Sequence, residues 1–362
     1  MAAKTLNRRI LWVDSLRGIA ALMVALLHLW LHLRFLYPTV FAQPVFKTAG
    51  LFISDFIDIG KIGIVVFFMI SGYVIPFSLI GKTLSGFAIS RFFRLYPGYW
   101  FSILLVVLIS GMPPLKQLLL NITMFHKFLG VPDLIGVYWT LQIELVFYLI
   151  CAALFYLNRL DKIRIITKLF FLVLGMALVL SVARFTLNMK LPVALPLALA
   201  CMFLGMRFRY NETAEDGTLR IVLKYVYIFI LVLLPVCVFA YNRDFGYNEK
   251  WYKYFVSYNI GFFLFIFFLK KNIHNSFFKF LGNISYSLYL IHPVVGLELT
   301  DKLMNKYPEF NNPGAYALLF LILTAIGSII SFFFIEQSIL KLSKTLFVGK
   351  KEKSTINTPV VG

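Results

Sequence analysis

The sequence predicts an all-α polytopic membrane protein with about ten transmembrane helices and both termini in the cytoplasm. Of its 362 residues, 60% are hydrophobic and 14% are charged, whereas soluble domains are on average about half apolar and a quarter charged. The apolar residues form runs of roughly 16 to 24 residues, close to the length that a helix needs to cross a bilayer. Groups of lysine and arginine separate these runs. The composition therefore excludes a soluble enzyme.

The first apolar run extends from residue 10 to about residue 33 and continues directly into Arg34. A cleavable signal peptide has a shorter apolar region followed by a small-residue cleavage site, so we expect a retained first span. We predict a membrane domain over residues 1–340, which holds this first span and those that follow it, and a cytoplasmic tail over 341–362. Nine further spans are expected at 62–80, 95–112, 138–157, 168–187, 191–206, 221–241, 254–269, 277–299 and 315–335.

The distribution of positive charge supports this number of spans. With the N-terminus inside, the predicted cytoplasmic segments hold about twice as many lysines and arginines as the predicted outer segments, as the positive-inside rule requires. The formal charge of +19 would suggest a nucleic-acid partner if the basic residues formed one patch. Because they lie in short groups between the apolar runs, we expect the lipid bilayer as a partner and no nucleic acid.

The three cysteines, Cys151, Cys201 and Cys237, lie in separate apolar runs, and none has a histidine at the spacing of a metal ligand. We therefore predict neither a disulfide framework nor a metal site.

Two ionisable residues of the first span lie on one helical face. Arg17 and His28 are 11 residues apart, which places them about 20° apart around a helix and about 16 Å apart along it. Ionisable groups are costly inside a bilayer and therefore indicate a functional site. The alternative is that Arg17 anchors the span and that His28 is a packing histidine with its polar groups satisfied.

Glu144 lies about as far from the outer end of its span as His28 does from the outer end of its own. Equal depth predicts a His28–Glu144 pair in which the carboxylate orients the imidazole and raises its basicity. The alternative is a structural pair between Glu144 and another group such as Arg184.

A late span carries a second histidine. Ser285, Tyr289 and His292 follow one another at steps of four and three, so they share a helical face. His292 is expected at the depth of His28, and Pro293 is expected to kink the helix beside it. Taken alone, this polar face is also typical of packing between membrane helices.

Arg91 and Arg94 lie three residues apart at the predicted cytoplasmic margin, where they could serve only as a topology signal. Together with Arg17 they could also form a three-arginine cradle for phosphates. In the second span, Ser71, Gly72 and Tyr73 form a small-residue break where a backbone or a ligand could approach closely.

Taken together, these residues resemble the acyltransferase family 3 of integral membrane proteins, which transfer acyl groups to sugars of cell-surface glycans. The resemblance covers nearly the whole chain and rests on four motifs in the expected order. They are a basic residue and a histidine in the first span (Arg17, His28), an arginine pair (Arg91, Arg94), a span that begins with tryptophan and contains glutamate (Trp139, Glu144), and a late segment with Gly282, Ser285, Tyr286, Tyr289 and His292.

The resemblance implies an O-acyltransferase of the bacterial plasma (inner) membrane with no permanently bound cofactor. Acyl-CoA, with acetyl-CoA expected, would be the donor, and a hydroxyl of a cell-surface or exported polysaccharide or glycolipid would be the acceptor. The implied roles are general base for His28, orientation of that base for Glu144, polarisation of the thioester carbonyl for His292 or a tyrosine, CoA phosphate binding for Arg17, Arg91 and Arg94, and lining of the substrate channel for Ser71, Tyr73, Trp139, Ser285 and Tyr289.

Another class of function is open at this point. A transporter or flippase of a lipid-linked sugar could use His28 and Glu144 as a proton relay. The inverted repeats and paired broken helices typical of such proteins are not apparent in the sequence. A purely structural membrane subunit would account for the apolar composition but not for two deep histidines.

Overall fold

The computed structural model describes residues 10–213, 219–245 and 249–347. Within these residues every regular element is helical, which confirms the all-α prediction. The predicted tail, residues 341–362, lies outside the described residues from residue 348 onward.

The described part of the chain holds nine helical segments that are long and apolar enough to cross a membrane. They confirm a polytopic membrane protein. The predicted span at 191–206 is also helical, as α10 (Ala194–Thr213), but it is not among the nine, because Arg207 and Arg209 lie in its last turns. The nine segments are Leu11–Leu36, Pro44–Leu79, Leu84–Ser110, Gly136–Tyr156, Ile163–Leu187, Leu219–Ala240, Trp251–Lys271, Ser276–Lys306 and Pro313–Ser343.

The chain folds into two compact units, of which unit 1 comprises residues 1–80 and 139–285. Its elements are α2 (Leu11–Leu36), α3 (Pro38–Phe41), α4 (Pro44–Gly50), the π-helical segment η1 (Leu51–Asp55), α5 (Ile59–Val74), η2 (Pro76–Leu79), α8 (Trp139–Tyr156), α9 (Ile163–Leu187), α10, α11 (Leu219–Ala240), α12 (Trp251–Lys271) and the first part of α13 (Ser276–Ile291).

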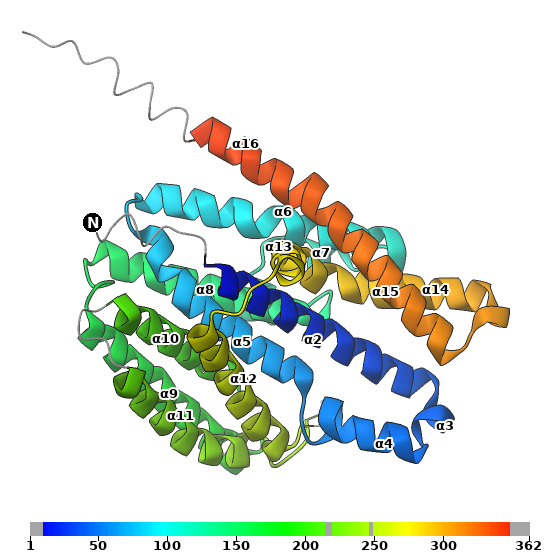
Figure 1. Ribbon diagram of the computed structural model, residues 1–362, viewed down its shortest axis with the longest axis horizontal. Helices are drawn as coiled ribbons and strands as arrows, with labels where there is room; N and C mark the ends of the chain where they lie inside the picture. The colour runs from blue at the N-terminus through cyan, green and yellow to red at the C-terminus, as the bar shows by residue number, and fades with distance from the viewer. Residues whose placement is uncertain (1–9, 214–218, 246–248, 348–362) are drawn as a thin grey trace, which may run out of the picture. The chain divides into compact units, whose positions relative to one another are not determined.

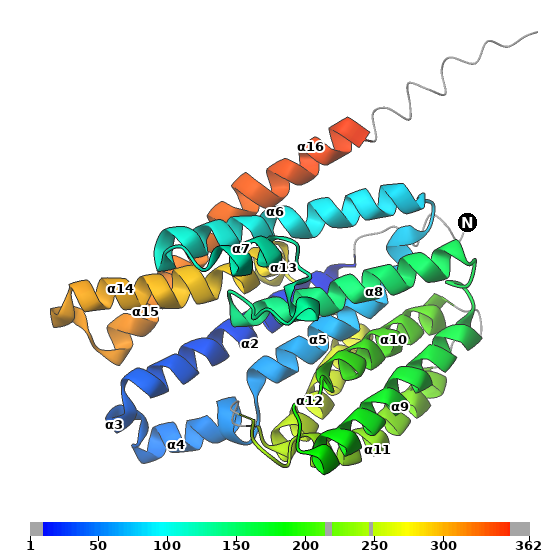
Figure 2. The same ribbon diagram turned by 180° about the vertical axis from the view of Figure 1, so that it is seen from behind.

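Helix α5 is the centre of unit 1, with α2, α10 and α12 packed against it (Figure 1). Two glycines allow this close packing. A Cβ atom on Gly63 would lie 2.6 Å from the carbonyl oxygen of Ala20 in α2, and one on Gly72 would overlap the backbone of Met202 in α10. Helices α9 and α11 complete the unit beside α10 (Figure 2).

The first turns of α2 cross α13 equally closely. A Cβ atom on Gly18 would lie 2.6 Å from the Cβ of Leu281, and one on Gly282 would overlap the carbonyl group of Asp14. Small residues are the usual means by which membrane helices reach backbone contact. The glycine of the late motif therefore fixes α13 against the first span.

Unit 2 comprises residues 81–138 and 286–362. Helix α6 packs on the segments η5, η7 and α16, and α15 packs on η5, α14 and η7 (Figure 1). The elements are α6 (Leu84–Ser110), α7 (Leu115–Ile122), η3 (His126–Leu129), η4 (Gly136–Tyr138), the end of α13, the π-helical segment η5 (His292–Glu298), α14 (Leu299–Lys306), η6 (Pro308–Phe310), α15 (Pro313–Ile330), the π-helical segment η7 (Ser331–Gln337) and α16 (Ser338–Phe347).

The α-helix predicted across 277–299 is interrupted at His292, where the chain changes to the π-helical segment η5. Pro293 lacks an amide N–H and so cannot continue the regular hydrogen-bond pattern. Glycines again allow close packing, since a Cβ atom on Gly98 of α6 would lie 2.9 Å from the ring of Tyr286.

Candidate functional site

Arg17 and His28 lie on one continuous helix, α2, and both side chains are half-buried. The start of α5 lies beside the turn that carries His28, because a Cβ atom on Gly60 would overlap the side chain of Leu27. The charges of Asp58 and Lys61, at this start of α5, both act on the His28 imidazole. Asp58, which caps the start of α5, and Lys61, in its first turn, thus lie near the turn of α2 that carries the predicted base.

Glu144 lies on α8 and accepts a hydrogen bond of 2.6 Å from the Tyr148 hydroxyl one turn along the same helix. Its pairing with His28 stays a prediction. The alternative partner, Arg184, instead forms a buried ion pair with Glu249, and its guanidinium lies 4.7 Å from the ring of Phe245. Arg184 is therefore a structural residue of unit 1.

The residues of the predicted small-residue break have distinct surroundings. Gly72 meets the backbone of α10, so the close approach expected there is a helix contact. The buried Tyr73 hydroxyl donates to the carboxylate of Glu212 and accepts a hydrogen bond of 3.1 Å from Arg209. Ser71 is half-buried. Roles for Ser71 and Tyr73 in a substrate channel stay predictions.

Trp139 and Ser285 also belong to unit 1. The Trp139 ring lies edge-on to Phe68 of α5, with 6.2 Å between the ring centroids. The buried Ser285 hydroxyl donates to the carbonyl of Gly282 at 2.8 Å. Both side chains therefore take part in helix packing, and their predicted roles in the channel are not tested by these contacts.

In unit 2, the structure brings Tyr289 and His292 together, with 6.1 Å between their ring centroids. His292 is buried, and its Nδ1 lies 3.0 Å from the carbonyl oxygen of Leu288. A carbonyl only accepts, so the proton of the neutral ring is on Nδ1 and Nε2 carries the lone pair. The Tyr289 hydroxyl donates to the carbonyl of Val137 at 3.1 Å.

Arg94 forms an ion pair with Glu336, which was not among the predicted site residues. Arg94 NH1 lies 3.4 Å from Glu336 Oε2, and Glu336 is 2% exposed. The same carboxylate accepts a hydrogen bond from Ser287, whose hydroxyl lies 3.0 Å from that of Ser331. The signal was present in the sequence as a carboxylate directly after a phenylalanine-rich run, one residue beyond the predicted end of the last span.

Arg91 lies one turn from Arg94, and its guanidinium is 5.5 Å from the ring centroid of Phe87. Both arginines lie within α6, which begins at Leu84, and their place at the cytoplasmic margin stays a prediction. The backbone stays helical there because Thr83 caps the first turn, accepting from the amide of Gly86 at 3.1 Å. Arg17 belongs to unit 1, so the three-arginine cradle stays a prediction.

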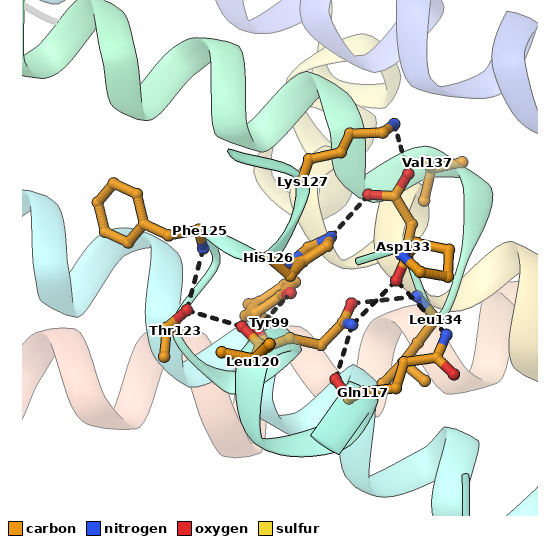
Figure 3. Close-up of polar contacts among 12 residues, drawn as sticks. Tyr99, Gln117, Leu120, Thr123, Phe125, His126, Lys127, Asp133, Leu134 and Val137 are labelled. Atoms are coloured by element: carbon orange, nitrogen blue, oxygen red, sulfur yellow. Dashed lines mark hydrogen bonds and ion pairs between the residues drawn. The ribbon is translucent and has the colours of Figure 1, made fainter. Parts of the chain in front are cut away.

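A second buried histidine, which the sequence pattern did not indicate, lies in the chain segment that connects α6 to α8. His126 Nε2 is 2.8 Å from one carboxylate oxygen of Asp133, and Lys127 Nζ is 2.5 Å from the other (Figure 3). The Asn121 side chain ties the same loop together. It donates to the carbonyls of Gln117 and Pro132 and accepts from the Leu134 amide. These contacts are all local, so the arrangement first of all stabilises its own loop.

Among the clusters of basic groups and carboxylates in the described residues, three bear on the predicted chemistry: His28 with Asp58 and Lys61, Arg94 with Glu336, and His126 with Asp133 and Lys127. Only the first places an imidazole on a membrane-spanning helix that also carries an arginine on its surface. Such an arrangement can accept a proton from a substrate hydroxyl and stabilise the resulting positive charge.

Comparison with known proteins identifies the family of the chain. No curated protein and no solved structure matches the chain. The family model described as "Acyltransferase domain" matches residues 10–333, nearly the whole chain. The two helices with the Arg17–His28 and Arg91–Arg94 motifs and the helix with Glu144 all lie within the matched residues. The chain therefore belongs to acyltransferase family 3 and is a membrane acyltransferase.

Proposed function

We propose that this membrane acyltransferase moves an acetyl group from acetyl-CoA to a hydroxyl of a cell-surface or exported polysaccharide or glycolipid, in the bacterial inner membrane. The observation that carries the proposal is the position of Arg17 and His28 on one continuous, membrane-length helix. The family fixes the type of reaction, and this helix gives the reaction a base.

The transfer is a single displacement at the thioester. His28 takes the proton of the acceptor hydroxyl while the hydroxyl oxygen attacks the carbonyl carbon. An ester C–O bond forms, the C–S bond breaks, and the departing CoA thiolate receives the proton from the His28 imidazolium. No protein nucleophile is required, because the thioester is already activated.

The donor phosphates are assigned to the arginines. A guanidinium group has five N–H donors, so the contact of Arg94 NH1 with Glu336 leaves donors for a phosphate. Arg91 and Arg17 supply further positive charge. In this assignment Glu336 also holds the Arg94 side chain in one orientation, which reduces the entropy that is lost when the donor binds.

His292 requires its protonated form for the proposed polarisation of the thioester carbonyl. In the neutral ring, Nδ1–H is held by Leu288, and Nε2 can only accept. The imidazolium would donate from Nε2 to the developing oxyanion. The proposal therefore assigns one neutral histidine, His28, and one charged histidine, His292, to the reactive state.

The test uses the full-length protein purified in detergent or in nanodiscs. Acetyl-CoA and an oligosaccharide acceptor should together release CoA thiol, and acetylated acceptor should appear by mass spectrometry. The matched control is His32→Ala, one turn beyond His28 on the same helix, which should keep wild-type turnover while His28→Ala loses it. A protein that binds the acceptor but releases no thiol contradicts the proposal and favours a transport function.

A further inference from the structure

Asp58 is a buried carboxylate to which the proposed function gives no role. It precedes α5 and is 4% exposed. Its Oδ1 accepts from the Lys61 amide at 2.9 Å, its Oδ2 lies 2.5 Å from Lys61 Nζ, and its own amide donates to the Ser257 hydroxyl at 3.0 Å. Both carboxylate oxygens and the backbone are thus held in place, so the negative charge has a fixed position.

This fixed charge lies beside the turn of α2 that carries His28. Helices α2 and α5 run antiparallel, since the Trp12 ring packs against Tyr73 at one end and Leu27 meets Gly60 at the other. Asp58 and Lys61 therefore lie near enough to His28 for their opposite charges to act on its imidazole. Because the carboxylate is buried, solvent ions screen this interaction far less than they screen a surface pair.

Other charged groups lie around the same end of unit 1. Arg34 pairs with Asp55 at 2.7 Å, and both side chains are partly exposed, which weakens their influence on His28. Lys253 of α12 is 5% exposed, and four charged residues act on its ammonium group: Asp58, Asp55, Lys61 and Arg34. Further titratable groups on the facing elements are His32 on α2, Tyr252 and Tyr258 on α12, Tyr254 on α12, whose ring lies 4.6 Å from Lys61 Nζ, and Glu144 on α8.

We propose that Asp58 is the positioning residue that stabilises the imidazolium form of His28 during acyl transfer, and that Lys61 opposes it while holding the carboxylate in place. The inference rests on the proposed function, which assigns the base role to His28. When His28 takes a proton it becomes positive, and a pre-oriented carboxylate favours that charge without further rearrangement. Under this proposal, Glu144 is not needed to stabilise the positive charge of the His28 imidazolium.

The structure offers variants that separate charge from shape. Asp58→Asn removes the charge but keeps the cap of α5, because asparagine and aspartate cap helices about equally well. Lys61→Gln removes the opposing charge. Glu144→Gln is the matched carboxylate control, and Ser257→Ala removes the support of the Asp58 amide while leaving both charges unchanged.

The first readout does not depend on activity. Diethyl pyrocarbonate modifies neutral imidazole, so the pH at which half of His28 is modified, followed by peptide mass spectrometry, reports its protonation in the full-length protein. We expect Asp58→Asn to move this midpoint to lower pH and Lys61→Gln to move it to higher pH, each by about one pH unit. Ser257→Ala and Glu144→Gln should leave it near the wild-type value. A merely structural role would not produce opposite displacements.

The second readout is the pH dependence of acetyl transfer. The acidic limb of the kcat/KM profile, where activity rises as His28 loses its proton, should move to lower pH in Asp58→Asn and to higher pH in Lys61→Gln. The kcat of Asp58→Asn should fall at least about tenfold. If Glu144→Gln displaces the His28 midpoint and Asp58→Asn does not, the inference is wrong even though transfer occurs. If the midpoints move as expected but the wild-type protein releases no CoA thiol, the influence of Asp58 on His28 stands and the proposed function fails.

Discussion

His28 and His126 each lie near a carboxylate and a lysine, but the two clusters are built differently. His126 is fully buried and hydrogen-bonded to Asp133, seven residues away in the same loop. His28 is half-buried, and its charged neighbours come from the start of another helix. The His126 cluster therefore stabilises a local segment of unit 2, whereas the residues near His28 come from two spans of unit 1. A histidine near an acid indicates catalysis only where the surrounding elements leave it accessible to a substrate.

Replacing His28 should have the largest effect on catalysis. His28→Ala should lower turnover by about 10²–10⁴-fold, because it removes the general base. Thermal unfolding of the purified variant should stay close to that of the wild-type protein. Turnover above about a tenth of the wild-type value would mean that His28, like His126, is not the catalytic base.

Arg94→Ala should have the largest effect on stability. It leaves the carboxylate of Glu336 buried without its cation, a loss that typically costs about 3 kcal/mol or more. The double variant Arg94→Ala/Glu336→Gln should recover most of the lost melting temperature while donor binding stays weak. A double variant as unstable as the single one would show that the pair does not stabilise unit 2.

Arg91→Ala should act on donor binding without such a loss of stability. Removing one charge-assisted contact to a phosphate costs about 1.5–3 kcal/mol, so KM for acetyl-CoA should rise by at least about tenfold. The KM for the acceptor should not change. Normal CoA affinity in calorimetry, combined with low activity, would instead give Arg91 an orienting role.

His126→Ala should destabilise the protein without changing its chemistry. Losing the partner of a buried carboxylate typically costs about 1–3 kcal/mol. The pH dependence of transfer should keep its wild-type shape, measured below the melting temperature of the variant. A displaced acidic limb of this pH profile would mean that His126, like His28, takes part in proton transfer.

Glu144→Gln should have the smallest effect, with activity reduced less than tenfold, because the amide still accepts the hydrogen bond from Tyr148. Cysteines placed at positions 28 and 144, in a background without the three native cysteines, test the pairing of the two residues directly. Efficient crosslinking by a short reagent would restore Glu144 as a partner of the base.

Hydropathy predicted the spans well and the short elements poorly. All ten apolar runs are helical, because about 20 apolar residues leave the backbone few other solutions in a bilayer. Helices such as α3, α4 and α7 have four to eight residues, too few for a periodic pattern. The start of α6 was placed too late because the charges of Arg91 and Arg94 interrupt the apolar run but not the helix.

The site was predictable along a helix and not between helices. Helical geometry relates Arg17 to His28 from their spacing alone. In contrast, nothing in a single sequence relates Glu336 to Arg94 or Asp58 to His28, because these pairs depend on which helices become neighbours. Equal depth likewise does not by itself relate Glu144 to His28, since many residues share a depth in the membrane.

The contact of Gly18 with Gly282 also bears on how the protein is made. More than 260 residues separate the two glycines. At a synthesis rate of about 5–20 residues per second, the first helix waits roughly 13–50 s for the segment that packs against its first turns. A chain that ends before residue 282 lacks the segment that packs against the first turns of α2.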